Sequence, residues 1–106
     1  MDEYLKGFCA AFDILAPYLE DLLGESHIFA LGDGKTFLRI NARDFPTPVK
    51  PGDEIPKNDS NYKAFESKKI IHEIMSRKVF GWDFKSTAMP IKDDDNNIVG
   101  TIALAR

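Results

Sequence analysis

Cysteine and histidine are scarce in this sequence, and their scarcity excludes several kinds of chemistry. The chain contains one cysteine, Cys9, and two histidines, His27 and His72. One cysteine cannot form an intramolecular disulfide, and neither histidine has a partner at the spacing typical of zinc sites. We therefore expect no disulfide framework and no bound metal. A haem held by either histidine or by Cys9 remains an alternative.

Long apolar runs and an excess of positive charge are also missing. No stretch approaches the roughly 20 apolar residues of a membrane-spanning helix, and Asp2 and Glu3 stand where a signal peptide would be basic. The formal net charge is -3, and the basic cluster 68–69 is short, so the sequence lacks the electrostatic footprint of a nucleic-acid binder. We expect a soluble, cytoplasmic protein that binds neither membranes nor nucleic acids.

Catalytic motifs are absent as well. The segment Gly32-Asp33-Gly34 lacks the remaining glycines and the Lys-Ser/Thr ending of a phosphate-binding loop. The acidic run 93–97 lacks the glycine and the distal glutamate of an EF-hand loop. Cys9 is expected in the core, where burial suppresses the reactive thiolate. We interpret the segments 32–34 and 93–97 as turns, and we expect that the protein is not an enzyme.

What is present is an amphipathic N-terminal helix in a chain of 106 residues, enough for one small domain. Pro17 predicts a kink or break near Ala16, giving two helical pieces, and Gly24 fits the position just past the helix end. The apolar residues of this helix form a stripe along one side. This stripe either packs on the domain's own sheet or pairs with a second copy of the chain, and we predict a homodimer through it. Apolar residues recur along this helix (1–24) at spacings of three and four: Leu5, Phe8, Phe12, Leu15, Leu19 and Leu22.

Strand-like patterns follow the helix. Residues 27–31 and 35–40 predict a hairpin, and a proline-rich stretch over 42–60 predicts an irregular loop that covers a binding site. Ser60 is predicted to cap a short helix over 61–67. The remaining predictions are a strand over 70–75, a turn over 76–78, a strand from Phe80 to Ile91, a turn over 92–97 and a strand over 98–104.

The order of several short motifs resembles a known family. Gly52-Asp53-Glu54-Ile55-Pro56 precedes Phe80-Gly81, then Pro90-Ile91 and Ile98-Val99-Gly100. Over about residues 25–106 this order is similar to PAS-like or Cache-like sensor domains, and more narrowly to the N-terminal domains of soluble bacterial methyl-accepting chemotaxis proteins. The resemblance implies an α+β fold with a five-stranded antiparallel PAS-like sheet, an N-terminal helix, and a short helix and loop between strands two and three.

The resemblance also implies a function: a chemotaxis-type input module that binds a small molecule between sheet and loop and relays to a C-terminal output domain. Phe37 and Arg39 are predicted to share a strand face, where an arginine beside an aromatic can hold a carboxylate. Strand alternation puts Trp82 and Phe84 opposite Lys85, without indicating which face looks inward. The candidate ligand-binding residues are Phe37, Arg39, Tyr62, Phe65, Trp82, Phe84 and Lys85.

Three alternatives remain open. Arg39 and Lys85 are equally compatible with solvated positions on the surface. A sheet face filled with apolar side chains would leave no room for a ligand, and the domain would then serve only to dimerise. Haem or redox sensing is the third.

Overall fold

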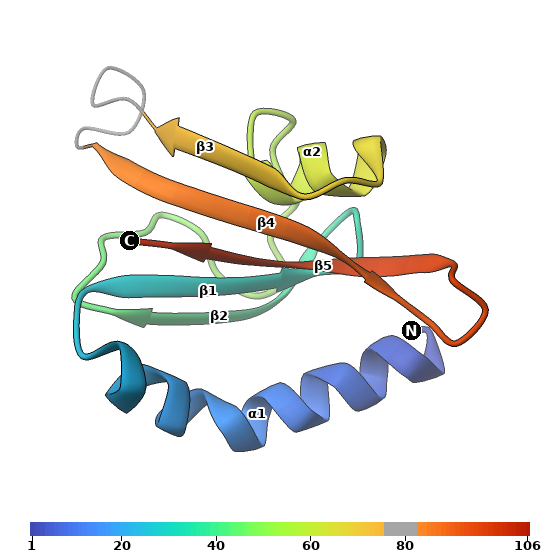
Figure 1. The fold of residues 1–106 in the computed structure, drawn as a ribbon, viewed down its shortest axis with the longest axis horizontal. Helices are drawn as coiled ribbons and strands as arrows, with labels where there is room; N and C mark the ends of the chain where they lie inside the picture. Colours follow the sequence, from blue (N-terminus) through green and yellow to red (C-terminus); the bar gives the residue numbers. More distant parts are fainter. Residues whose placement is uncertain (76–82) are drawn as a thin grey trace.

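A five-stranded antiparallel sheet lies between two helices (Figure 1). The computed structural model describes residues 1–75 and 83–106. The strands lie in the order β2-β1-β5-β4-β3, and every neighbouring pair is antiparallel. The predicted α+β class, N-terminal helix and five-stranded antiparallel sheet are confirmed. The elements are α1 (Glu3–Leu23), β1 (His27–Gly32), β2 (Phe37–Arg43), α2 (Ser60–Ser67), β3 (Ile71–Met75), β4 (Phe84–Lys92) and β5 (Ile98–Ala105).

The N-terminal helix α1 has a cap at each end. The Asp2 carboxylate accepts a hydrogen bond from the Leu5 N–H at 3.0 Å, and Gly24 takes the left-handed conformation, with φ of 64°, just beyond the last turn. The prediction of two helical pieces is wrong, because α1 is one helix with Pro17 inside it. Pro17 cannot donate to the carbonyl of Asp13, but both residues are exposed, so that carbonyl remains within reach of water. Figure 1 shows α1 bowed, with its concave side toward the sheet.

Large apolar side chains fill the space between α1 and the sheet. Phe12 meets Phe29 of β1 edge to face, with ring centroids 5.7 Å apart, a favourable geometry for aromatic pairs. Cys9 is buried in the same cluster, and burial raises the pKa of its thiol, as predicted. The helix over 1–24 and the sheet over 25–106 therefore share one core. The buried members of this cluster are Leu5, Cys9, Phe12, Ala16, Phe29, Leu31 and Ile91.

The opposite face of the sheet carries smaller side chains. Ala64 of α2 contacts Ala88 of β4 and Ala103 of β5, and all three are buried. Because side chains alternate along a strand, Ala30 points to this face while Phe29 and Leu31 point toward α1. The sheet therefore has one face of large residues under α1 and one face of small residues under α2.

Element boundaries depart from the sequence predictions by one or two residues in most cases. The cap of α2 is the Asp59 side chain and not Ser60, which is the first helical residue. Strand β2 runs over 37–43 instead of 35–40, and β3 begins at Ile71. The predicted turn over 76–78 and the predicted strand start at Phe80 lie outside the described residues.

Both predicted hairpin turns are confirmed. Asp33 Oδ1 accepts hydrogen bonds from the backbone N–H groups of Lys35 and Thr36 in the turn between β1 and β2. Asp93 Oδ1 accepts from the N–H of Asn97 in the turn between β4 and β5. These are carboxylate-stabilised turns of the kind that Asp favours. Within the described ranges, neither helix is long and apolar enough to cross a membrane.

Candidate functional site

A cavity of about 170 Å³ lies on the sheet face away from α1. Its floor is formed by β1, β4 and β5, and its roof by the irregular chain between β2 and α2, which Figure 1 shows crossing this side of the sheet. Four residues of the floor, Ala30, Ser86, Ala103 and Ala105, have short side chains, which leaves space where the α1 side has packed rings. The lining residues from the strands are Ile28, Ala30, Phe37, Phe84, Ser86, Ala103 and Ala105.

Aromatic and proline side chains build the walls. Phe45 of the loop meets Phe84 of β4 edge to face, with ring centroids 5.3 Å apart, and this pair joins the loop to the sheet beside the cavity. Phe37 at the start of β2 is almost fully buried. Pro46, Pro48 and Pro56 line the cavity from the loop, where fixed φ angles restrict the conformations open to the chain.

Backbone hydrogen bonds fasten the loop to β2. The Phe37 N–H donates to the Asp53 carbonyl at 2.9 Å, and the Gly52 N–H donates to the Phe37 carbonyl at 2.8 Å. Gly52 has a φ of 96°, a conformation that residues with a side chain rarely adopt. Ile55 is buried against Ala30 and Phe37. The loop over 44–59 is therefore irregular, as predicted, but anchored along its middle.

The polar end of the cavity lies at the start of α2. Asp59, Ser60 and Asn61 all line it. Asp59 Oδ1 accepts from the Asn61 backbone N–H at 2.8 Å and from its side-chain amide at 3.2 Å. Burial raises the pKa of the Asp59 carboxyl, and the hydrogen bonds from Asn61 only partly oppose that rise. The cavity thus holds a half-buried carboxyl group whose solvation is reduced.

Ser60 adds an unused hydrogen-bonding group. Its side chain is 4% exposed, and among the described residues its hydroxyl oxygen has no hydrogen-bond partner. A buried hydroxyl without a partner carries a free-energy cost, which a ligand with a matching group would remove. Because this oxygen is closed to water in the conformation described, a ligand would reach it only after the hydroxyl rotates toward the cavity that Ser60 lines.

Asn61 connects this end of the cavity to the last strand. The Thr101 hydroxyl of β5 donates to Asn61 Oδ1 at 2.7 Å, and both residues are buried. The result is a hydrogen-bonded series from Asp59 through Asn61 to Thr101. It joins the capping turn of α2 to the strand that ends the described chain.

Two of the predicted ligand-binding residues, Phe37 and Phe84, line the cavity. Tyr62 is half-buried against the cluster of Ala30, Phe37 and Ile55, beside the cavity rather than in its lining. Phe65 lies over Gly34, where its ring is so close that a methyl group on Gly34 would collide with it.

Trp82 lies outside the described residues, and Lys85 lies on the sheet face opposite the cavity. Lys85 is exposed and contributes to a shallow surface depression with Glu25, Ile74 and Arg106. The predicted alternation along β4 is confirmed over its described part, since Phe84 and Ser86 share the cavity face. The structure adds that this face looks inward.

The prediction that Arg39 shares a face with Phe37 is wrong. Phe37 pairs with Gly32 and Arg39 with Leu31, so Leu38 is an extra residue that forms a bulge in β2. A bulge interrupts the alternation of side chains, and Arg39 turns toward α1. Its guanidinium donates to both carboxylate oxygens of Asp13, at 2.8 and 3.1 Å, and it does not line the cavity.

The two histidines also lie away from the cavity. His27 is buried on the α1 side of the sheet, where its Nδ1 is 2.8 Å from the Glu25 carbonyl oxygen. His72 bonds to the Thr87 hydroxyl at 3.0 Å near the surface. Across residues 1–75 and 83–106, no cluster of His, Cys, Asp and Glu has a geometry that could hold a metal ion.

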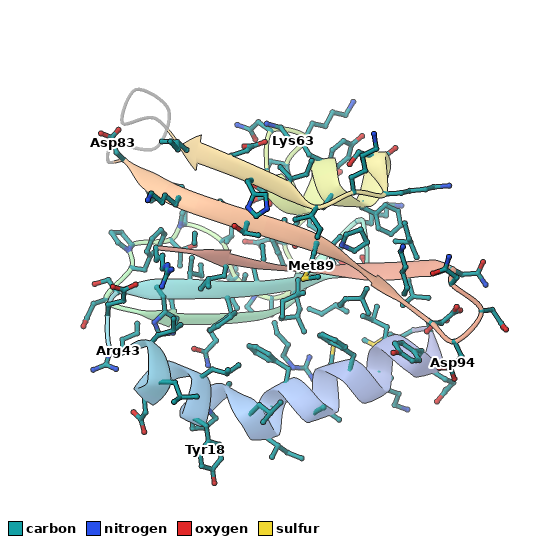
Figure 2. All side chains as sticks on the ribbon, viewed as in Figure 1. Tyr18, Arg43, Lys63, Asp83, Met89 and Asp94 are labelled. Carbon is teal, nitrogen blue, oxygen red and sulfur yellow. The ribbon has the colours of Figure 1, made fainter. Side chains whose placement is uncertain are left out.

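The predicted dimer residues divide into two groups. Leu5 and Phe12 are buried under the sheet, and Phe8 and Leu19 pack partly against the same cluster. In this arrangement those four contact their own domain, while Leu15 is exposed. The dimer itself stays a prediction, and the apolar side chains that α1 leaves available to a partner are Tyr4, Ile14, Leu15, Tyr18 and Leu22. Figure 2 shows Tyr18 pointing away from the sheet.

Sequence reasoning missed the polar end of the cavity. Asp59 stands directly before the predicted cap Ser60, and Asp is as good a capping residue as Ser, so the signal for the correct cap was present. That the cap also lines a cavity follows only from the loop folding back over Ala30, Ala103 and Ala105.

Comparison with known proteins gives one relative to set beside this geometry. No family model matches the chain, and no solved structure matches it. Over 95 residues, 89% of the chain, it is 27% identical to a protein of Bacillus subtilis (strain 168) named "Putative sensory transducer protein YfmS". The chain spans about a third of that protein's length, since the match covers 33% of it. The chain is therefore similar, over this range, to part of a protein whose name describes a sensory transducer.

Proposed function

We propose that this chain is a PAS-like ligand-sensing input module of a bacterial chemotaxis-type signal-transduction protein. It binds a small molecule between sheet and loop and relays the bound state to an output domain. The observation that carries the proposal is the cavity of about 170 Å³ under the loop, with aromatic walls and a polar end. Pockets of this composition, apolar with a few placed polar groups, are typical of small-molecule sites. The similarity to a sensory transducer favours the same function.

The route of the signal in this proposal is β5. A ligand shifts an equilibrium only if it binds two states with different affinity. A molecule that contacts Asp59 or Ser60 changes the environment of Asn61, and Asn61 accepts the Thr101 hydroxyl in the middle of β5. Any segment that follows Arg106 is joined directly to this strand. The series Asp59-Asn61-Thr101 is therefore the proposed link between ligand and output.

The test is to fill the cavity without charge. Ala105 lines it from the end of β5, and Ala105→Leu occupies that space, whereas Ala42→Leu adds the same atoms at an exposed position of β2. Native mass spectrometry of protein purified from cells and a thermal-shift screen of ring-sized fragments measure binding. A fragment at 100 times its Kd adds about 2.7 kcal/mol to the free energy of unfolding.

We expect an adduct or stabilising fragments for the parent chain and for Ala42→Leu, and neither for Ala105→Leu. A parent chain that carries no adduct and is stabilised by no fragment contradicts the proposal. So does an Ala105→Leu variant that binds as well as the parent.

A second candidate, a dimerisation module without ligand, is favoured by the exposed face of α1. Tyr4, Ala11, Leu15, Tyr18 and Leu22 are all exposed and recur at spacings of seven, four, three and four, which places them along one side of the helix. In this function the exposed side of α1 pairs with its copy in a second subunit. Uncovered apolar area of this kind marks interaction surfaces.

A matched pair of substitutions tests the dimer. Ile14 borders this side of α1, because it lies three residues after Ala11 and four before Tyr18. Ile14 is 70% exposed, and Ile74 on β3 is 78% exposed. If α1 forms the interface, Ile14→Glu yields a monomer in light scattering at concentrations where the parent and Ile74→Glu are dimers. A parent chain that is monomeric throughout, or an Ile14→Glu variant that stays dimeric, contradicts the dimer.

A further inference from the structure

We propose that the cavity selects compact organic amines, with an apolar body about the size of one ring and a single ammonium group at the Asp59 end. This inference rests on the proposed function, in which the cavity binds a small molecule, and it names the chemical class. An arginine facing the cavity would have indicated a carboxylate ligand, but Arg39 does not line the cavity.

Charge is the first argument. Of the described residues that line the cavity, Asp59 alone is ionisable at neutral pH, and no Lys, Arg or His is among them. A carboxylate or phosphate ligand would therefore bring a second negative charge beside Asp59 in a poorly solvated space, without a cation to offset it. An ammonium group would instead form a charge-assisted hydrogen bond with Asp59.

The hydrogen bonds of Asp59 leave part of its carboxyl group available. Both side-chain hydrogen bonds in the described structure, from the Asn61 backbone N–H and the Asn61 amide, end on Oδ1. The charges that act on Asp59 from neighbouring elements are Lys63 of α2 and Glu73 of β3. Lys63 donates to Glu73 at 2.7 Å, so that lysine is already engaged. Asp59 is thus a half-buried carboxylate that forms no ion pair within the described residues.

Ser60 supplies the second polar contact once its hydroxyl rotates toward the cavity that the residue lines. An ammonium group carries three donors, and the Ser60 hydroxyl oxygen is a buried acceptor without a partner among the described residues. Asp59 and Ser60 are consecutive and both line the cavity. Further oxygen acceptors on the lining are those of Thr47, Asn58 and Ser86. The polar end thus accepts a donor-rich group.

Volume limits the apolar part of the ligand. An engineered cavity of roughly 150 Å³ holds one benzene molecule, and this cavity measures about 170 Å³. Its walls include Phe37, Phe84 and Val49, which suit a ring or a branched alkyl group. A ligand with one ring and one short aminomethyl arm matches both the volume and the polar end.

Three probes of similar size and different charge test the inference. Benzylamine, benzyl alcohol and benzoate are titrated at pH 7 by calorimetry and by NMR against the parent chain. We expect benzylamine to bind at least tenfold more tightly than benzyl alcohol, and benzoate to bind most weakly. Lowering the pH through the pKa of Asp59 is expected to weaken benzylamine binding and to leave benzyl alcohol unaffected, because the protonated carboxyl group has no charge to pair.

Asp59→Asn keeps a good helix cap and removes the charge. Its benzylamine affinity is expected to fall at least tenfold, to that of benzyl alcohol, whose own affinity stays unchanged. Asp2→Asn makes the same change at the cap of α1, on the other side of the sheet, and is expected to keep the preference for the amine.

The outcomes separate the two proposals. If benzyl alcohol or benzoate binds the parent chain as tightly as benzylamine, or if Asp59→Asn keeps the preference, the amine inference is overturned while the sensor proposal stands. If none of the three probes binds, the amine inference is likewise overturned, and the adduct and fragment measurements on Ala105→Leu decide the sensor proposal independently.

Discussion

The two faces of the sheet are built from the same strands yet differ in how they are filled. On the α1 side, Phe29 and Leu31 of β1 pack against Phe12 and its neighbours on the helix, and the strand surface is covered. On the other side, Ala30, Ala103 and Ala105 leave a hollow, and the loop over 44–59 arches across it. Because alternate residues of one strand point to opposite faces, one sequence can specify a solid face and a hollow face together.

The difference shows how a small domain can hold a binding site without losing its core. A chain of this size has limited apolar area to bury, and the α1 cluster concentrates the large side chains on one side. On the hollow side, the loop is held over the sheet by its backbone hydrogen bonds to Phe37 and by the buried side chain of Ile55. Stability and binding are thus assigned to different faces.

The largest effect is expected from breaking the solid face. Phe12→Ala removes a buried ring from the α1 cluster, and such truncations cost about 3–5 kcal/mol in the free energy of unfolding. Leu22→Ala removes a side chain that is 82% exposed and is expected to cost less than about 0.5 kcal/mol. Urea denaturation of both variants checks this, and equal losses would show that α1 is not docked on the sheet.

The comparison is sharpened by making one substitution on both faces. Ala16 under α1 and Ala105 in the cavity are 5% and 7% exposed, so burial is matched. Ala16→Leu overpacks a filled cluster, with an expected cost of about 1–3 kcal/mol, whereas Ala105→Leu enters free volume and is expected to cost less than about 1 kcal/mol. Denaturation midpoints measure both, and a larger loss for Ala105→Leu would mean that the cavity face is as full as the other.

Asp59, on the hollow face, is expected to make the stability of the domain depend on pH. Its pKa is raised by burial, so the stability it contributes is fully present below its unfolded pKa and is lost as pH rises through the folded pKa. Relative to the parent chain, Asp59→Asn is therefore expected to gain stability as pH rises through that range, without ligand. Denaturation of the parent chain, Asp59→Asn and Asp2→Asn between pH 3 and 8 tests this. If the parent chain instead becomes more stable relative to Asp59→Asn as pH rises, the prediction is wrong.

The smallest effect is expected from the ion pair that ties α1 to β2. The Arg39 and Asp13 side chains are 38% and 50% exposed, and exposed pairs contribute roughly 0.2–1 kcal/mol. A double-mutant cycle with Arg39→Met and Asp13→Asn measures the coupling free energy. The hydrogen bond from Arg39 lowers the pKa of Asp13, so the coupling is expected to disappear as pH falls through that lowered value. A coupling that persists at low pH would contradict this.

Much of the fold could be predicted from the sequence, because periodicity carries it. The stripe from Leu5 to Leu22 identified α1, although Leu15 and Leu22 prove exposed, since a stripe drawn at threes and fours drifts around a straight helix. Pro17 misled the prediction because its cost depends on whether the freed carbonyl is buried, which local sequence does not reveal. Both turns were recognisable from their Asp side chains.

The site was less predictable, for two physical reasons. The bulge at Leu38 reversed the direction of Arg39, and a bulge depends on the pairing partner as well as on the strand itself. A cavity depends on what is missing: short side chains at Ala30, Ala103 and Ala105 become a binding site only once the loop closes over them. The sequence analysis selected aromatic residues as candidates for ligand binding and did not select these alanines or Asp59.

Xenon binding tests the central claim, that one face of the sheet is solid and the other hollow, without assuming any ligand chemistry. Xenon enters apolar cavities, and methyl NMR under xenon pressure reports which side chains it approaches. We expect shifts of the Ile28, Ala30, Ala103 and Ala105 methyl groups, with those of Leu5, Ala16 and Leu31 unchanged, and we expect the shifts to vanish in Ala105→Leu. Shifts of equal size on the α1 side, or none on either face, would contradict the account.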